Sequence, residues 1–341
     1  MNRGSRLPPG SQGYSAAMRA AIVYNPVKIE RAELERHIEA VAPEGVELTW
    51  LETDADDAGA AAVGRALEAS PELLVVAGGD GTVRVGADQA ARAGVTLGII
   101  PAGTGNLLAR NLGIDVLIQR NAVRAAFGDV EREIDLGELE VESPEGERST
   151  HAFAVMVGFG LDAEMIKATD EDLKKKVGWL AYIEAAGKVI SSLDKVRVSV
   201  RADGGRTTRH TVNTMVVGNC GTVTNGIVLL PDAVVDDALL DVALIRPRGW
   251  RGWAQVAAYV ARNNLIVTKL LRRQGKLGKQ RSGAALGYGQ AKEVVARLDE
   301  PRTVQVDGDV VGTAIALRAT VRDDALRVRV PKRRIGLGPA V

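Results

Sequence analysis

A glycine-rich loop that directly follows a short apolar run is the feature that most limits how this chain can fold. The run is Leu73–Ala77, and the loop is Gly78–Thr82, with the sequence Gly-Gly-Asp-Gly-Thr. A continuous apolar run is typical of a strand buried on both faces of a parallel sheet. Glycines after such a strand let the main chain approach an anion, and the following helix start adds positive potential. The pattern predicts an α/β fold with a phosphate-binding turn.

A second loop of the same kind follows the next apolar run. Val95–Ile100 leads into Pro101–Asn106, with the sequence Pro-Ala-Gly-Thr-Gly-Asn, and a helical run begins at Leu107. Loops at the ends of successive parallel strands face one crevice, where open α/β sheets bind ligands. Either loop alone could be a turn without a ligand, but the pair favours a nucleotide. Because Asp80 in the first loop would repel phosphate, we expect Mg²⁺ between the two.

The second loop also carries groups suited to a nucleotide. Thr104 offers a hydroxyl, Gly103 and Gly105 offer backbone N–H groups, and Asn106 offers an amide at the helix start. Asn25, which ends the first apolar run and precedes a proline, would lie on the same rim. A lone Asn-Pro is usually only a turn, so the position of Asn25 at the end of the strand is the only reason to count it as a ligand residue.

Composition narrows the class of protein. The chain has 341 residues, 46% hydrophobic and 4% aromatic, which allows two domains with aliphatic cores. A net charge of +1 argues against a strongly basic nucleic-acid binder. The lone Cys220 excludes an internal disulfide framework and fits a reducing compartment. We expect a cytoplasmic protein that starts functionally at Met18, with residues 1–17 as a disordered leader.

The spacing of apolar runs changes near residue 130. Residues 18–130 alternate short apolar runs with amphipathic helical windows, which predicts a Rossmann-like, nucleotide-binding α/β domain. Residues 131–330 predict a β-sandwich domain for the substrate, with helical windows at Gly178–Ser191 and Trp250–Leu271 and a C-terminal tail, 331–341, that returns to the first domain. The expected strands of the second domain are Glu133–Glu140, Ala152–Val157, Val196–Arg201, Thr211–Gly218, Leu239–Ile245, Glu293–Leu298, Thr303–Val306 and Arg327–Val330.

Two acidic segments of the second domain have alternative interpretations. Asp307 and Asp309 flank a glycine between strand-like runs. Asp-Gly is a common hairpin turn, but a hydroxyl nucleophile needs a proton acceptor, which a carboxylate in an interdomain cleft would supply. Residues 231–237, with the sequence Pro-Asp-Ala-Val-Val-Asp-Asp, form either an exposed acidic turn or an oxygen-ligand metal loop.

Basic residues gather in two places next to apolar ones. Residues 262–281 carry several Lys and Arg and no acidic residue, and Lys174–Lys176 precedes Trp179–Tyr182. A solvated basic face is the default interpretation. Basic residues beside exposed aliphatic and aromatic ones also suit an anionic membrane surface. The three histidines have no metal-ligand spacing, and we assign them no role.

Taken together, these segments resemble the diacylglycerol kinase catalytic family, in its soluble bacterial lipid-kinase branch, which includes relatives of the sphingosine kinases. The matching segments, in chain order, are Tyr24–Pro26, Gly78–Thr82, Pro101–Asn106, Gly178–Tyr182, 231–241 and Asp307–Asp309. The resemblance implies an enzyme with ATP in a cleft between two domains. It implies that the nucleotide is held by Asn25, Gly78, Gly79, Gly81, Thr82, Gly103, Thr104, Gly105 and Asn106.

The resemblance also implies roles for acidic residues. Asp307 would be the general base on a lipid hydroxyl, supported by Asp309, and Asp80 would act through Mg²⁺ and its waters. A second, structural Mg²⁺ would be held by Asp237 with the backbone carbonyls of Val234 and Leu239. Lys176 and its neighbours would help present the site to anionic lipid.

The chain departs from the family pattern at four places. Arg84-Val85 stands where Asn-Glu is common, and Leu107 stands where many bacterial diacylglycerol kinases have Asp. Asp309 replaces the usual Glu, and Ala238 replaces a Gly. These departures bear on the number of catalytic metals and on the lipid accepted, and they leave the expected base in place.

The expected function is ATP-dependent phosphorylation of diacylglycerol or a related long-chain lipid alcohol at a membrane surface, within phospholipid biosynthesis. We expect peripheral contact with anionic membrane and no nucleic-acid partner, and a homodimer is left open. The alternatives are a kinase related to NAD kinase or phosphofructokinase, a sphingosine or ceramide kinase, and a non-catalytic nucleotide- or lipid-binding homologue.

Overall fold

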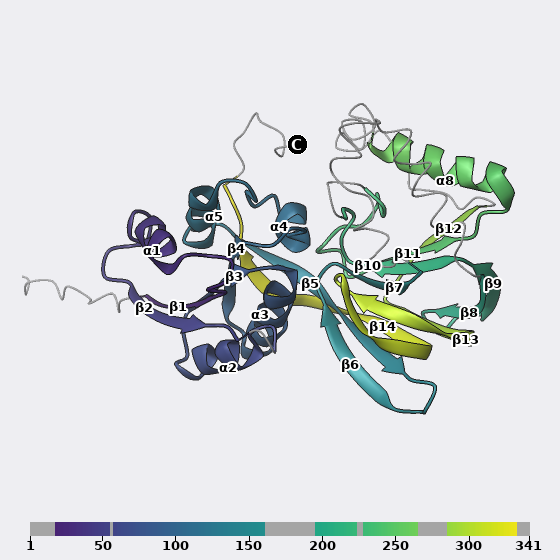
Figure 1. Ribbon diagram of the computed structural model, residues 1–341, viewed down its shortest axis with the longest axis horizontal. Coiled ribbons are helices and arrows are strands. Elements are labelled where there is room, and N and C mark those ends of the chain that lie inside the picture. The colour runs from purple at the N-terminus through teal and green to yellow at the C-terminus, as the bar shows by residue number, and fades with distance from the viewer. Residues whose placement is uncertain (1–17, 55–56, 161–194, 224–227, 265–284, 333–341) are drawn as a thin grey trace, which may run out of the picture.

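A computed structural model describes residues 18–54, 57–160, 195–223, 228–264 and 285–332. It contains an N-terminal α/β domain and a C-terminal domain dominated by antiparallel strands, as Figure 1 shows. The α/β elements are β1 (Arg19–Tyr24), α1 (Arg31–Glu39), β2 (Glu47–Glu52), α2 (Ala60–Glu68), β3 (Leu73–Gly78), α3 (Asp80–Ala93), β4 (Thr96–Pro101), α4 (Leu107–Asn111) and α5 (Gln119–Ala126). Those that follow are β5 (Glu131–Glu142), β6 (Arg148–Phe153), β7 (Met156–Phe159), β8 (Val196–Ala202), β9 (Thr208–Val212), β10 (Thr214–Gly218), β11 (Leu240–Ile245), α8 (Gly249–Asn264), β12 (Leu286–Ala291), β13 (Glu293–Val306) and β14 (Asp309–Arg329).

The α/β domain is a three-layer structure around a parallel sheet in the order β4-β3-β1-β2. Apolar side chains of α2 and α3 pack on one face of the sheet, and those of α1 and α5 pack on the other. Every residue of β3 is buried, as expected for a continuous apolar strand covered on both faces. The Rossmann-like α/β prediction is confirmed.

The C-terminal domain has a separate apolar core between its strands. Alternate residues of β8, β13 and β14 enter this core together with Phe153 and Phe159. Helix α8 lies over β11 and β12, where Val256 and Tyr259 pack against a smaller apolar cluster (Figure 1). The sandwich-like arrangement agrees with the predicted β-rich domain.

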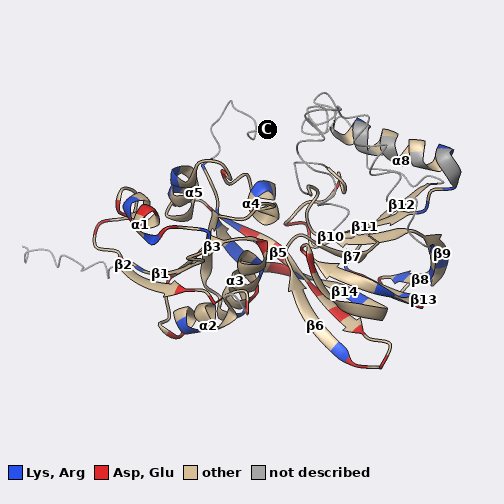
Figure 2. Cartoon of the chain, viewed as in Figure 1, with Lys and Arg blue, Asp and Glu red and all other residues tan. Residues whose placement is uncertain are grey.

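The long strand β14 connects the two domains. It pairs with β13 and β5 in the C-terminal domain, and near its end Val328 pairs with Leu97 of β4 in parallel. Figure 2 shows acidic and basic residues close together along β5 and β14, where Arg318 lies 3.0 Å from Glu140. The segment 327–330 was expected to be one more sandwich strand, but it joins the edge of the α/β sheet.

Two expected strands are interrupted in the structure. The segment 152–157 divides into β6 and β7, because the N–H groups of Ala154 and Val155 bond to the Asp307 carboxylate instead of to a strand. The segment 211–218 divides at Asn213 into β9 and β10, which pair with different partners. The expected helix at 178–191 lies outside the described residues, as does the end of the expected helix at 250–271.

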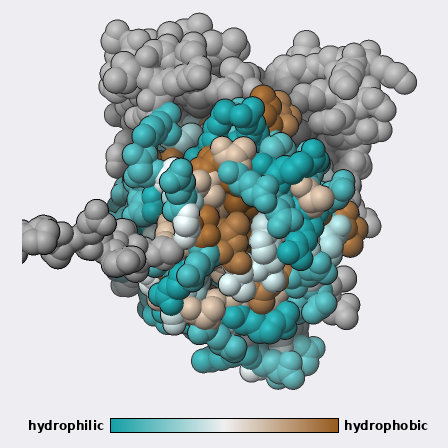
Figure 3. All heavy atoms as spheres, turned by 90° about the vertical axis from the view of Figure 1, so that its left-hand side faces the viewer, coloured by the Kyte–Doolittle hydropathy of each residue, from teal (hydrophilic) through white to brown (hydrophobic). Residues whose placement is uncertain are grey.

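The side of the α/β domain formed by β2 carries an apolar band between hydrophilic surfaces (Figure 3).

No helix in the described part of the chain has the length and apolar character needed to cross a membrane.

Candidate active site

The two glycine-rich loops touch each other at the carboxyl end of the sheet. They follow β3 and β4, whose last residues Gly78 and Pro101 are partners in the parallel ladder. A Cβ atom on Gly103 would lie 2.8 Å from the Cα atom of Gly79, closer than real Cβ atoms approach. Glycine is therefore required at Gly103 for the loops to pack backbone to backbone, which leaves their N–H groups near one another.

The Asp80 carboxylate holds the second loop against the first. It accepts hydrogen bonds from the backbone N–H groups of Asn106 at 2.9 Å and Leu107 at 2.6 Å. Since these N–H groups begin α4, the carboxylate also lies at the positive end of that helix. Sequence reasoning gave Asp80 a contact with magnesium and missed this structural link. Leu107 takes part through its backbone, and its side chain joins the apolar core.

The Asn106 side chain braces the same loop from within. Its Oδ1 accepts the Gly103 N–H at 2.8 Å, and its Nδ2 donates to the Gly103 carbonyl at 2.7 Å. Asn106 has a left-handed backbone, with φ of 49°, and is 7% exposed. Thr82 is also buried and lies beside Gly78, whereas Thr104 is exposed at the loop. Of these side chains, Thr104 has its hydroxyl best placed to reach a ligand.

The end of β1 completes the rim. β1 lies between β2 and β3, so the strand order reverses there. Open α/β sheets bind ligands at the carboxyl ends of the strands at such a point. Asn25 follows β1, and its Oδ1 accepts the Val27 N–H at 3.0 Å, which stabilises the turn. The exposed Lys28 from this turn reaches the first loop, where its Nζ would lie 2.7 Å from a Cβ on Gly79. Lys28 is a phosphate ligand candidate that sequence analysis missed.

Asp307 enters the site from the C-terminal domain. It is the first residue of the two-residue turn between β13 and β14, with φ of 50°, followed by Gly308 at 97°. The predicted hairpin turn and the predicted buried carboxylate are thus the same feature. The side chain is 5% exposed and accepts N–H bonds of 2.8 to 2.9 Å from Ala154, Val155 and Met156.

Burial raises the pKa of Asp307 to about 6, although the three backbone N–H groups and the Arg84 charge act in the opposite direction. A carboxylate with this pKa is ionised at neutral pH and still basic enough to accept a proton from a reacting hydroxyl. Asp307 therefore has the properties required of a general base.

The turn between β6 and β7, which carries the three N–H donors, is held by residues that follow β10. The Val155 carbonyl accepts the N–H groups of Asn219 at 2.9 Å and Cys220 at 3.2 Å. The buried Cys220 thiol donates to the Ala154 carbonyl, and burial raises the pKa of this thiol. Cys220 is therefore a packed, protonated residue and not a nucleophile.

Arg84 and Asp309 connect the two sides of the site. Arg84 lies one turn after Asp80 on α3, and its Nη2 is 3.0 Å from Oδ2 of Asp309. The same Asp309 oxygen would lie 3.3 Å from a Cβ on Gly81. A small pocket lies between the domains, lined by Asp80, Val83, Arg84, Leu108, Ala154, Val155 and Asp307. The structure thus brings together the predicted acidic residues, although they come from different domains.

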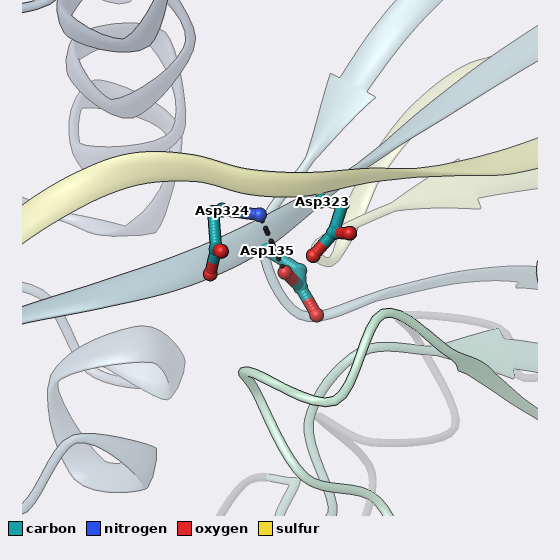
Figure 4. Close-up of side chains that lie close together, drawn as sticks. All are labelled: Asp135, Asp323 and Asp324. Atoms are coloured by element: carbon teal, nitrogen blue, oxygen red, sulfur yellow. Dashed lines mark hydrogen bonds between the residues drawn. The ribbon is translucent and has the colours of Figure 1, made fainter.

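The expected structural metal loop has a different organiser, Asp135. The Asp135 carboxylate is buried in β5 and accepts the N–H groups of Ala238 and Asp324, each within 2.8 Å. Figure 4 shows Asp135 with Asp323 and Asp324, which form a bulge in β14 opposite it. Burial raises the pKa of Asp135, and the two backbone hydrogen bonds act in the opposite direction.

One contact of a predicted ligand of that loop lies within the loop itself. Asp237 Oδ1 accepts the Leu239 N–H at 3.2 Å, and Val234 is exposed. A magnesium ion on Asp237, Val234 and Leu239 stays a prediction. Lys176 and most of the basic segment 262–281 lie outside the described residues.

Comparisons with known proteins agree with this geometry. Residues 19–139 match the family described as "Diacylglycerol kinase catalytic domain", and residues 155–330 match the "YegS C-terminal NAD kinase beta sandwich-like domain". A Bacillus subtilis protein named "Diacylglycerol kinase" is 28% identical over 307 residues, which are 86% of this chain and 90% of that protein.

Two further relatives extend the comparison. A Pseudomonas aeruginosa protein described as "Probable lipid kinase YegS-like" is 32% identical over 217 residues, 63% of this chain and 67% of that protein. The crystal structure of a diacylglycerol kinase from Bacillus anthracis superposes with a TM-score of 0.63 at 20% identity, covering 92% of this chain and 96% of that one. The structural likeness supports the two-domain fold.

Proposed function

The chain belongs to the lipid kinase family that joins a diacylglycerol kinase catalytic domain to a YegS-type β-sandwich domain, and from this premise we propose that it transfers the γ-phosphoryl group of ATP to the hydroxyl of diacylglycerol or a related long-chain lipid alcohol. The observation that carries the proposal is the position of Asp307. A buried carboxylate of raised pKa lines a pocket together with Asp80 of the first glycine-rich loop.

The residues divide the work between the two domains. The N–H groups of the Gly78–Thr82 and Pro101–Asn106 loops and the Lys28 ammonium bind and orient the phosphates. Asp307 accepts the proton of the lipid hydroxyl while that oxygen bonds to the γ-phosphorus, and the bond from this phosphorus to the leaving ADP oxygen breaks. Ala154, Val155 and Met156 fix the orientation of the base through their N–H groups.

Two of the three acidic residues keep oxygen lone pairs that could bind the water ligands of magnesium. Asp80, Asp307 and Asp309 already accept two, three and one protein hydrogen bonds. Since a carboxylate offers about four lone-pair sites, Asp80 and Asp309 keep room for the water ligands of an ion bound to the nucleotide. When bound, Mg²⁺ would neutralise phosphate charge.

The lipid and the membrane form the finer part of the proposal. Phosphorylation at a membrane surface requires peripheral contact of the protein with lipid, and we expect anionic phospholipid to raise the rate. Sphingosine and ceramide stay alternative acceptors. NAD and fructose 6-phosphate stay alternatives because their kinases share the first glycine-rich loop, although the second loop resembles the lipid kinases.

The test is a turnover assay with ATP and Mg²⁺ on mixed micelles. Each micelle contains diacylglycerol, monoacylglycerol, ceramide or sphingosine, with and without anionic phospholipid, and NAD and fructose 6-phosphate are tested in solution. We expect ADP release and a phosphorylated lipid with the diacylglycerol micelles. Phosphorylation of NAD, or ATP binding without turnover on any acceptor, would overturn the proposal.

A further inference from the structure

Arg84 brings a cation into this site. Arg84 extends from α3, the helix that starts at the first glycine-rich loop, and its side chain is 18% exposed. It lines the small pocket together with Asp80 and Asp307. Arg84 therefore lies beside the first glycine-rich loop and the proposed base.

The hydrogen bonds of Arg84 are incomplete. Its Nη2 donates to Asp309, but its Nε is buried without a hydrogen-bond partner. A buried unpaired donor on a cation is costly, so such a group calls for an explanation. The planar guanidinium matches the geometry of phosphate oxygens and can offer two parallel N–H bonds to them. The unpaired Nε thus belongs to a residue that lines the pocket beside Asp80 of the first glycine-rich loop.

The Asp309 ion pair orients this side chain. Asp309 is about half-exposed and begins β14, so the pair ties the end of the guanidinium to the domain opposite α3. An ion pair exposed to this extent contributes little to stability on its own. Its effect is to hold the guanidinium in one orientation beside the pocket.

We propose that Arg84 is a further catalytic residue of this kinase, whose guanidinium binds the γ-phosphoryl group of ATP and stabilises the charge on it during transfer. The inference rests on the proposed function, because it assigns a role within the same phosphoryl transfer. As the lipid oxygen bonds to phosphorus and the ADP oxygen leaves, negative charge spreads over the three equatorial oxygens. Arg84 meets that charge, while the lipid proton goes to Asp307.

Arg84 lowers the pKa of Asp307 and thereby opposes the effect of burial. The same cation adds to the three backbone N–H groups in favouring the ionised base, and it attracts the phosphoryl group.

The first test compares nucleotide binding by Arg84→Asn and by the unaltered protein, using isothermal titration calorimetry with ADP and with the β,γ-imido analogue of ATP. Loss of a γ-phosphate contact is expected to weaken the analogue about tenfold or more while leaving ADP within about twofold. The control is Arg92→Gln, an exposed arginine of the same helix that pairs with Asp88. It should bind both nucleotides like the unaltered protein. Equal weakening of both nucleotides, or of neither, by Arg84→Asn would refute the proposal.

A second pair of variants separates catalysis from structure. Arg84→Lys keeps the charge but loses the planar donor pair, and it is expected to fold normally and to retain more turnover than Arg84→Asn. Asp309→Asn removes the charge that orients the guanidinium but keeps the cation itself, so a smaller loss is expected than for Arg84→Asn. If Asp309→Asn abolished the preference for the ATP analogue while Arg84→Asn kept it, the Asp309 carboxylate would carry the effect and the proposal would be wrong.

Turnover completes the test. Arg84→Asn is expected to lower kcat by about a hundredfold or more, since arginines in this role contribute about 10³ to 10⁵ in related phosphoryl transfers. Addition of guanidinium ion to Arg84→Ala should restore part of the rate. An absence of lipid phosphorylation by the unaltered protein would instead count against the proposed function, and the binding comparison would still test the role of Arg84.

Discussion

Replacement of Asp307 by Asn is the sharpest test of the proposed base. Asn has nearly the same shape but cannot accept the lipid proton, so kcat should fall by about 10² to 10⁴, the usual contribution of a general base. The ATP affinity should change little, because the phosphate loops lie in the other domain. The carbonyl oxygen of Asn can still accept the two N–H groups, from Val155 and Met156, that bond to Oδ1 of Asp307.

The stability of this variant follows from two opposing contributions. The pKa of Asp307 is raised on folding to about 6, a shift of about two units that corresponds to about 3 kcal/mol. The stabilisation by the protonated acid is fully present below about pH 4 and is lost as the pH rises through 6. At neutral pH the buried, ionised carboxylate destabilises the fold, and Asn removes that destabilisation. Asn also leaves the Ala154 N–H facing an amide N–H₂ group, which costs about 1 to 3 kcal/mol of stability. The two contributions offset each other, so the melting temperature should change little.

The pH profile gives the most direct measurement. In the unaltered protein, kcat/KM should rise with pH through about 6 and then level off, because only the ionised carboxylate accepts a proton. The residual rate of Asp307→Asn should lack this acid limb. Asp299→Asn is a matched control, since Asp299 is an exposed aspartate near the middle of β13 that pairs with Arg197. A rate within tenfold of the unaltered protein for Asp307→Asn, with the acid limb retained, would refute the assignment.

Three further predictions follow from the packing of the site. Gly103→Ala places a Cβ 2.8 Å from the Gly79 Cα, so it should weaken ATP binding at least tenfold in calorimetry, whereas Gly289→Ala, which meets nothing within 4 Å, should not. Asp80→Asn replaces one of the two carboxylate oxygens that accept N–H groups at the start of α4 by an N–H₂ donor. A lower melting temperature and weaker ATP binding are expected. Unchanged values of both would contradict the role of Asp80 in joining the two loops. The buried Cys220 should resist iodoacetamide until the protein unfolds; its modification in the native state, detected by mass spectrometry, would contradict its burial.

The sequence predicted the nucleotide side of the site well because that side is built from local signals. An apolar strand followed by glycines is visible in any short window, and Gly78 and Pro101 do end neighbouring parallel strands. The Asp-Gly turn at Asp307 was equally visible. Its burial was proposed from the need for a base, since the turn signal alone suits an exposed hairpin.

The rest of the site depends on contacts between distant parts of the chain. Arg84 and Asp309 are 225 positions apart, and nothing in either local sequence pairs them. The strand break at Ala154 and Val155 arises because a carboxylate about 150 residues away takes their N–H groups. Periodicity sees only neighbours in sequence, so it predicted one continuous strand there. Lys28 was missed for the same reason, because its target, Gly79, follows another strand.

The course of β14 explains how the base and the second phosphate loop come to lie on one sheet. The strand starts at Asp309, beside Arg84, and ends in the α/β sheet, where Val328 pairs with Leu97 of β4. β5 pairs with it on both sides of the bulge, and Asp135 satisfies the N–H of Asp324 where that ladder is interrupted. The base and the second phosphate loop are thus placed by one hydrogen-bonded sheet. Groups held on rigid strands keep the alignment that phosphoryl transfer requires, so binding energy can be used to position the lipid.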